Sequence, residues 1–192
     1  DTGGWQNWRT ITKAGVALTG GQHVLRLNML TIGKSGITGN FNWLRLAPAG
    51  GKSGLAATFY DTDTLSGPAT SLTVGNVNFN WGTGAPLPTI APDGTFSARF
   101  DGFLQAPATS DYTLYTRADD GVRLWIDDQL LINDWTRHPA TERSTTFHFE
   151  AGKKYSLRLE YFQADCGASL KLSWSSVTMA RDVIPASAFS TV

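Results

Sequence analysis

The chain has 192 residues, of which 41% are hydrophobic, 11% are aromatic and only 17% are charged. Sixteen Lys and Arg side chains balance sixteen Asp and Glu side chains, so the formal net charge is zero and no overall field attracts nucleic acid or an anionic membrane. No apolar run reaches the roughly 18 residues expected of a membrane-spanning helix. These values disfavour partners that bind through net charge and predict ample material for a hydrophobic core.

Segments that alternate apolar and polar residues follow one another along the chain, each bounded by Gly, Pro, Asn, Asp or Ser. They cover residues 16–19, 23–30, 41–46, 95–104, 112–116, 122–127, 145–150, 155–162 and 169–174. A period of two is typical of strands with one buried face. No segment longer than about ten residues has a helical stripe. The pattern predicts an all-β protein built from β-sandwiches.

The small-residue segment APAGGKSG separates two parts of unequal size. We expect one unit at residues 1–48, a linker at 49–53 and a second unit at 54–192. The first unit is too short to bury an independent core. The chain also begins at Asp1 without a Met, so we expect a fragment of a larger multidomain protein.

Three motifs follow in order in the first unit: TGGWQNW from Thr2, VALTGGQHVLRL from Val16 and GNFNWLRL from Gly39. The unit resembles the C-terminal half of a family-six carbohydrate-binding module, a jelly-roll β-sandwich that holds sugars between aromatic rings. The resemblance implies that Trp5 stacks on a sugar and that Asn40 hydrogen-bonds its hydroxyls. The first half of such a module, with the second aromatic ring, is not in the sequence. Packing or simple exposure of Trp5 is therefore an equal alternative.

Asp119 and Asp120 stand side by side at a turn between two alternating segments. Adjacent strand residues point to opposite faces, so aiming both carboxylates at one point requires the backbone to leave strand geometry. A hard cation such as calcium, which takes about six to eight oxygen ligands, would offset the cost. The other interpretation is a simple hairpin, because Asp-Gly is a favoured turn that Asp119 would only cap.

The second unit carries a longer series of motifs. These are GLAATFYD at 54–61, VNFNWGTGAP at 77–86, the run from FSARF to NDW at 96–135, AGKKYSLRLEYFQ at 151–163 and VIPASAF at 183–189. Together they closely resemble the protective-antigen-type (PA-fourteen) domain, found in bacterial toxins, glycosidases and yeast adhesins. The resemblance covers essentially residues 54–192. It implies a twisted antiparallel β-sandwich, with carbohydrate recognition as the commonest role. In sugar-binding members, calcium sits on an acidic pair joined by a cis peptide bond, which Asp119 and Asp120 match.

The resemblance also implies that a later loop completes the calcium site, and here that loop is QADCGAS, residues 163–169. Gln163 offers an amide oxygen, Asp165 a carboxylate and the region of Gly167 a backbone carbonyl. The alternative is an ordinary polar hairpin with nothing bound. Cys166, the single cysteine, has no predicted role, because no His lies nearby in the sequence to activate it and a soft thiolate suits calcium poorly.

Trp135 matches an Asn-Trp or Asp-Trp position of the family. Its ring either stacks on a sugar or packs beneath the loop. A second acidic pair, Asp127 and Asp128, is predicted to form a plain hairpin turn. The three histidines, His23, His138 and His148, lack the spacing of metal ligands and are predicted to be structural or solvated.

The sequence contains no G-x-S-x-G nucleophile motif and no phosphate-binding glycine loop. Without a metal, Asp119 and Asp120 are too close in sequence to act as the acid and base of a glycosidase. We therefore expect a non-catalytic, calcium-dependent carbohydrate-binding segment of a larger secreted bacterial protein that is glycoside-active or adhesive. Its partner would be a polysaccharide or glycan. The alternative is a structural spacer or protein-interaction module without a ligand.

Overall fold

The computed structural model of the protein describes residue 24 and residues 53–90 and 94–191. The chain divides into two units, residues 1–50 and 51–192, and every described residue except Val24 belongs to the second. The jelly-roll prediction for residues 1–48 lies outside the described residues, as do the predicted sugar contacts of Trp5 and Asn40. The fold described below is therefore that of the second unit.

Two antiparallel sheets make up this unit. The seven-stranded sheet has the order β2-β1-β4-β9-β6-β7, with β12 paired to β4, and the five-stranded sheet has the order β11-β10-β5-β8, with β3 paired to β10. The strands of the first are β1 (Leu55–Tyr60), β2 (Ala69–Val74), β4 (Phe96–Leu104), β6 (Val122–Ile126), β7 (Gln129–Asp134), β9 (Tyr155–Gln163) and β12 (Phe189–Ser190). The strands of the second are β3 (Asn78–Gly82), β5 (Ser110–Asp119), β8 (Thr141–Phe149), β10 (Ala168–Ser176) and β11 (Met179–Val183). A short 3-10 helix, η1 (Ala186–Ala188), precedes β12, and the predicted all-β sandwich is confirmed.

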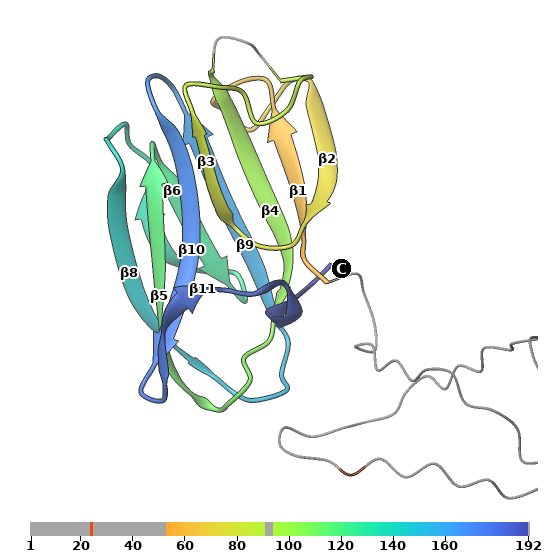
Figure 1. The fold of residues 1–192 in the computed structure, drawn as a ribbon, viewed down its shortest axis with the longest axis vertical. Helices are drawn as coiled ribbons and strands as arrows, with labels where there is room; N and C mark the ends of the chain where they lie inside the picture. The colour runs from red at the N-terminus through yellow and green to blue at the C-terminus, as the bar shows by residue number, and fades with distance from the viewer. Residues whose placement is uncertain (1–23, 25–52, 91–93, 192) are drawn as a thin grey trace, which may run out of the picture. The chain divides into compact units, whose positions relative to one another are not determined.

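The two sheets lie face to face, with β8, β5 and β10 in front of β6 and β9 in Figure 1. Alternate side chains of each strand fill the space between the sheets. The largest fully buried side chains include Phe96, Phe100 and Tyr161 from the first sheet, and Tyr112 and Phe149 from the second. Removing each such ring from water contributes about 1.5–3 kcal/mol, so these interlocked rings are a main source of the domain's stability.

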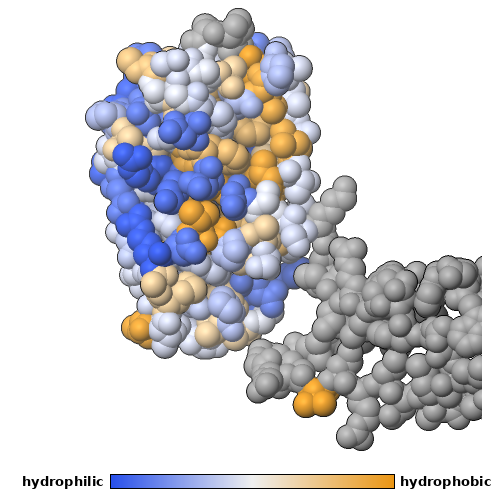
Figure 2. All heavy atoms as spheres, in the orientation of Figure 1, coloured by the Kyte–Doolittle hydropathy of each residue, from blue (hydrophilic) through white to orange (hydrophobic). Residues whose placement is uncertain are grey.

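The outer face of the five-stranded sheet is hydrophilic. Figure 2 shows polar side chains gathered over β8, β5 and β10, where Arg117 pairs in register with Glu142 on one side and Lys171 on the other. Arg181 of β11 reaches Glu142 with an Nη1–Oε1 distance of 3.0 Å. In the part of the chain that the structure describes, no helix has the length and apolar character needed to cross a membrane.

The outer face of the seven-stranded sheet contains a buried charge. The Glu160 side chain of β9 is only 5% exposed and lies between Arg99 of β4 and Arg123 of β6, which are 35% and 29% exposed. Arg99 Nη2 lies 2.9 Å from Glu160 Oε1, and Arg123 Nε donates to Oε2 at 3.1 Å. One carboxylate thus ties three neighbouring strands together across the middle of the sheet.

Replacing Glu160 with Ala should lower the free energy of unfolding by about 2–3 kcal/mol, because two arginines would lose their shared carboxylate. The loss is smaller than for a fully buried pair, since both arginines are partly exposed to water. Urea denaturation measures it. Glu142→Ala is the matched control, because its pairing with Arg181 is exposed and its loss should cost less than about 1 kcal/mol. Equal losses in the two variants would contradict this account.

Candidate functional site

The acidic pair lies where β5 ends and β6 begins. Asp119 is the last residue of β5, Asp120 and Gly121 form the connection, and Val122 opens β6. The peptide bond between Asp119 and Asp120 is cis, as the family resemblance implied. β9 ends and β10 and β8 begin at the same end of the sandwich, since Asp119 pairs with Ser169 and its neighbour Ala118 pairs with Thr141. The pair therefore sits among the loops that join these strands.

Asp120 is buried, with 4% of its surface exposed, and each of its carboxylate oxygens accepts a hydrogen bond. The backbone N–H of His138 donates to Oδ1 at 3.0 Å, and the backbone N–H of Ala164 donates to Oδ2 at 2.9 Å. These donors come from the loop between β7 and β8 and from the loop between β9 and β10. Asp120 thus holds two loops against the acidic pair, and such charge-assisted bonds are the stronger kind.

Asp119 is only half-buried. Its carboxylate accepts the backbone N–H of Ala140, and burial followed by the charge of Asp120 raises its pKa. Its backbone carbonyl accepts the hydroxyl of Tyr161, a core residue whose pKa is also raised by burial and by the two carboxylates. Tyr161 therefore stays protonated and remains a donor. The two carboxylates create a negative potential in which a cation would be stabilised.

Gln163 ends β9 and Asp165 lies in the loop that follows, and the structure gives both side chains partners within the protein. The buried amide of Gln163 accepts the Tyr161 hydroxyl at 2.9 Å and donates to the Asp165 carbonyl. The Asp165 carboxylate is largely exposed, 3.6 Å from Nη1 of Arg137. The Gln163 side chain thus links the end of β9 to the backbone at Asp165, and the Asp165 carboxylate lies at the surface of the loop. Their predicted role as metal ligands stays a prediction.

A cation at the acidic pair would need several oxygen ligands from the surrounding residues. Within residues 53–90 and 94–191, no group of three or more His, Cys, Asp and Glu side chains is placed to hold a metal ion. Two adjacent carboxylates nevertheless suit calcium, which accepts carboxylates, backbone carbonyls and water together, although each carboxylate also accepts a backbone N–H. These residues fit calcium when backbone carbonyls and water, in place of further acidic side chains, supply the remaining ligands.

Trp135 follows β7 and packs on protein groups. Its ring meets Phe162 edge-on with centroids 4.8 Å apart, and the guanidinium of Arg123 lies 4.0 Å from its centroid. The structure therefore places this ring in the packing position that the sequence left open as an alternative. Its predicted sugar contact stays a prediction.

The loop between β7 and β8 was not singled out as a unit by the sequence. Asp134 organises it: its carboxylate accepts the Thr136 hydroxyl at 2.9 Å and lies 3.1 Å from His138 Nε2 and 2.8 Å from Arg143 Nε. His138 is thus structural, as predicted, and it reaches the acidic pair through its backbone. Nothing in the sequence distinguishes Asp134 from an exposed aspartate, because its burial is a property of the fold.

Two minor predictions can also be compared with the structure. Asp127 and Asp128 form the turn between β6 and β7 with positive φ angles of 46° and 61°, which confirms the plain hairpin. Cys166 is exposed, and the neighbouring Asp165 carboxylate raises the pKa of its thiol. A thiol held in its protonated form is a poor nucleophile.

The fold and the site define a class: an antiparallel β-sandwich module that carries a cis-linked acidic pair among the loops at one end. The chain belongs to the PA14 domain family, which matches residues 51–188.

Three known proteins show the range of similarity. The anti-sigma-I factor RsgI3 of Acetivibrio thermocellus is 45% identical over 111 residues, which cover 58% of this chain and 17% of that protein. The structure of an anti-sigma factor domain-containing protein from Clostridium clariflavum has a TM-score of 0.71 at 32% identity, covering 80% of this chain and 52% of that chain. A PA14 sugar-binding domain from an RTX adhesin has a TM-score of 0.58 at 16% identity, covering 73% of this chain and 99% of that chain, and so shows the fold alone. The chain spans about a sixth of the length of the curated relative.

Gly121 leaves room for a ring beside the acidic pair. A Cβ at this position would lie 2.2 Å from Cε1 of Phe162, whose ring is held by Trp135. Gly121→Ala should therefore lower the free energy of unfolding by about 1–3 kcal/mol through overpacking. Thermal and urea unfolding measure the change. Gly75→Ala is the control: the nearest atom would be 3.5 Å away, so we expect a change within about 0.5 kcal/mol. Unchanged stability in Gly121→Ala would show that Phe162 moves freely.

The raised pKa of Asp119 predicts how stability depends on pH. Its ordinary value is 3.8, and the folded state takes up the proton at higher pH than the unfolded state. Ionised Asp119 therefore opposes folding at neutral pH, and this opposition fades as the pH falls from the folded pKa towards 3.8. In chelator, Asp119→Asn should raise Tm slightly at pH 7, with a difference that shrinks on acidification. A lower Tm for Asp119→Asn than for the wild type at pH 7 would oppose the prediction.

Proposed function

We propose that this chain is a non-catalytic, calcium-dependent carbohydrate-binding segment of a larger extracellular protein. The observation that carries the proposal is the arrangement of Asp119 and Asp120. One carboxylate is buried and fixed by backbone donors from two loops, whereas the other is half-buried beside it with a raised pKa. A pair of this kind is suited to holding a cation at the surface.

Asp119 and Asp120 would hold the calcium ion, with further oxygens from the loop at residues 163–169 and from water. Calcium bound there would supply coordination positions that vicinal hydroxyls of a sugar can occupy. Gly167 supports this position for the ligand, because a Cβ on it would lie 3.8 Å from Oδ2 of Asp119, so the loop comes close to the carboxylate without a side chain. The chain's own residues orient the ion and shape its surroundings, and no reaction is involved.

Family membership supports the same function. The RTX adhesin domain with this fold is described as sugar-binding. The similarity to anti-sigma factor proteins favours an anti-sigma factor as the parent, in place of the glycoside-active or adhesive parent expected from the sequence. Extracellular placement follows from this proposal, since millimolar calcium and polysaccharides are found outside the cell.

The competing function is a spacer or protein-interaction module without a ligand. The contacts of Gln163 and Asp165 favour it, since both side chains have partners within the protein. The two functions differ in one measurable respect. A spacer binds no calcium at millimolar concentration and shows no calcium-dependent glycan selectivity.

Calcium titration calorimetry tests the proposal directly. The wild-type chain should bind one calcium ion, and Asp119→Asn should weaken the affinity at least tenfold because it removes one of two anionic ligands. Asp182→Asn, an exposed acidic residue on β11, is the matched control and should leave the affinity unchanged. On a panel of soluble polysaccharides, binding by the wild type should be lost in chelator. Absence of calcium binding in the wild type, or equal affinity in Asp119→Asn, would favour the spacer.

A further inference from the structure

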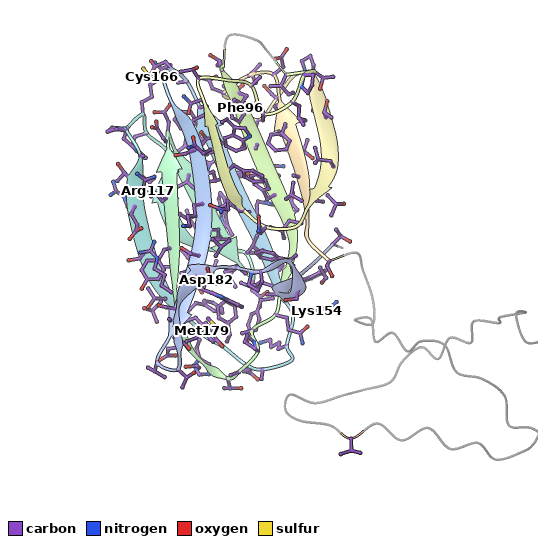
Figure 3. The ribbon with its side chains drawn as sticks, in the orientation of Figure 1. Phe96, Arg117, Lys154, Cys166, Met179 and Asp182 are labelled. Carbon is purple, nitrogen blue, oxygen red and sulfur yellow. The ribbon has the colours of Figure 1, made fainter. Side chains whose placement is uncertain are left out.

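A small hollow opens on the outer face of the seven-stranded sheet, away from the acidic pair. Its volume is about 170 Å³. The side chains that line it are Asp101, Phe103, Trp125, Asp128, Ser156 and Arg158. Ser156 lies at the start of β9 and Gln163 at its end, so about seven residues, or roughly 23 Å, separate the hollow from the calcium-site loop. Figure 3 shows the same separation: Lys154 before β9 and Cys166 after it lie at opposite ends of the domain.

The hollow exists because a short side chain stands between larger ones. Ser156 pairs in register with Phe103 of β4, and the next outward residue of β9, Arg158, pairs with both Asp101 of β4 and Trp125 of β6. The two aromatic side chains therefore rise on either side of β9. Ser156, with one hydroxyl, leaves the space between them open.

Hydrogen bonds hold the residues that line the hollow. Arg158 Nε donates to Asp101 Oδ1 at 3.2 Å, and the backbone N–H of Ser156 donates to Asp127 Oδ1 at 2.8 Å. The second contact anchors the β6–β7 turn, whose next residue, Asp128, reaches the hollow. Each ring also has a cationic neighbour: Arg123 lies 5.4 Å from the centroid of Trp125, and Lys154 Nζ lies 5.8 Å from that of Phe103. The walls are thus set before any ligand arrives.

The chemistry of these walls matches a sugar ring. Phe103 and Trp125 are partly exposed and offer apolar faces for the C–H groups of a pyranose. Carboxylates, a hydroxyl and a guanidinium beside them can accept from and donate to ring hydroxyls. Pockets for drug-sized ligands measure about 300–1,000 Å³, so a hollow of about 170 Å³ takes one ring and not an extended oligosaccharide. The carboxylates of Asp101 and Asp128 are balanced by the Arg158 guanidinium, which bonds to Asp101, and by Lys154, whose Nζ lies 5.8 Å from the Phe103 centroid, so no net charge at the hollow favours an ionic sugar over a neutral one.

We propose that this hollow is a second, calcium-independent carbohydrate site that binds one neutral pyranose unit of a polysaccharide. Trp125 and Phe103 provide the stacking surface, and Asp128, Arg158 and Ser156 orient the hydroxyls. The site shares no residue with the proposed calcium site. A polysaccharide that contacts both ends of the domain would be held by avidity, which raises the overall affinity without requiring either site to bind tightly.

Calorimetry in chelator, with the full chain and with cellohexaose, xylohexaose and mannohexaose as probes, tests the second site. The wild type should bind at least one of these neutral hexasaccharides, and Asp119→Asn should bind it equally. Trp125→Ala should weaken binding at least tenfold, whereas Trp125→Phe should recover part of the affinity. Ser156→Val, a residue well suited to a strand, should fill the hollow and weaken binding to a similar extent while the fold is kept.

Leu130→Ala is the matched control, because Leu130 pairs with Trp125 on the neighbouring strand, is 43% exposed and does not line the hollow. It should leave the affinity unchanged. No binding of any probe by the wild type in chelator would overturn the proposal, as would equal affinities for wild type, Trp125→Ala and Ser156→Val. Failure of the calcium site has a different signature, since it leaves chelator-resistant binding in place.

Discussion

The buried carboxylate of Asp120 accepts one backbone N–H from each of two loops, and the arrangement of the whole loop end depends on this interaction. A carboxylate is removed from water here, which is costly unless both oxygens find donors. The donors are backbone groups that would otherwise be unpaired in irregular segments. One side chain therefore accepts a backbone hydrogen bond from each of two loops, and those loops lie beside the half-buried Asp119.

Neighbouring groups adapt to the charge that this arrangement concentrates. Tyr161 remains protonated, and its single hydroxyl proton is shared between the Asp119 carbonyl and the Gln163 amide oxygen on the core side. On the solvent side, Arg137 lies near Asp165 across the mouth of the loops. Burial, followed by the charge of Asp120, leaves Asp119 with a raised pKa. Functional sites are where such perturbed pKa values are expected.

The sequence was sufficient for the central strands. The predicted segments at 122–127 and 155–162 nearly coincide with β6 (Val122–Ile126) and β9 (Tyr155–Gln163), because each has one face in the core. Six strands, β1, β2, β3, β7, β11 and β12, lie outside the predicted alternating segments. β2 and β11 were missed because most of their residues are exposed and no alternation results. An edge strand is specified by its partner's backbone more than by its own side chains.

The same distinction applies to the site. Asp119 and Asp120 were found because carboxylates are visible in a sequence. The donors that position them, the N–H groups of His138, Ala140 and Ala164, could not be found, since every residue except proline has one. Gln163 was recognised for its amide oxygen, yet which atom that oxygen faces depends on Tyr161, two residues earlier on the same strand.

The ion pairs of Glu160 with Arg99 and Arg123 in the middle of β9 have one more consequence. Glu160 lies between Ser156 and Gln163 and is joined to strands on both sides, which resists bending of β9 between the two ends of the domain. The distance between the proposed binding sites is then set by the fold. A glycan that occupies both must have a minimum length, and shorter fragments are confined to one end at a time. The domain would thereby distinguish intact polymer from its degradation products by size alone.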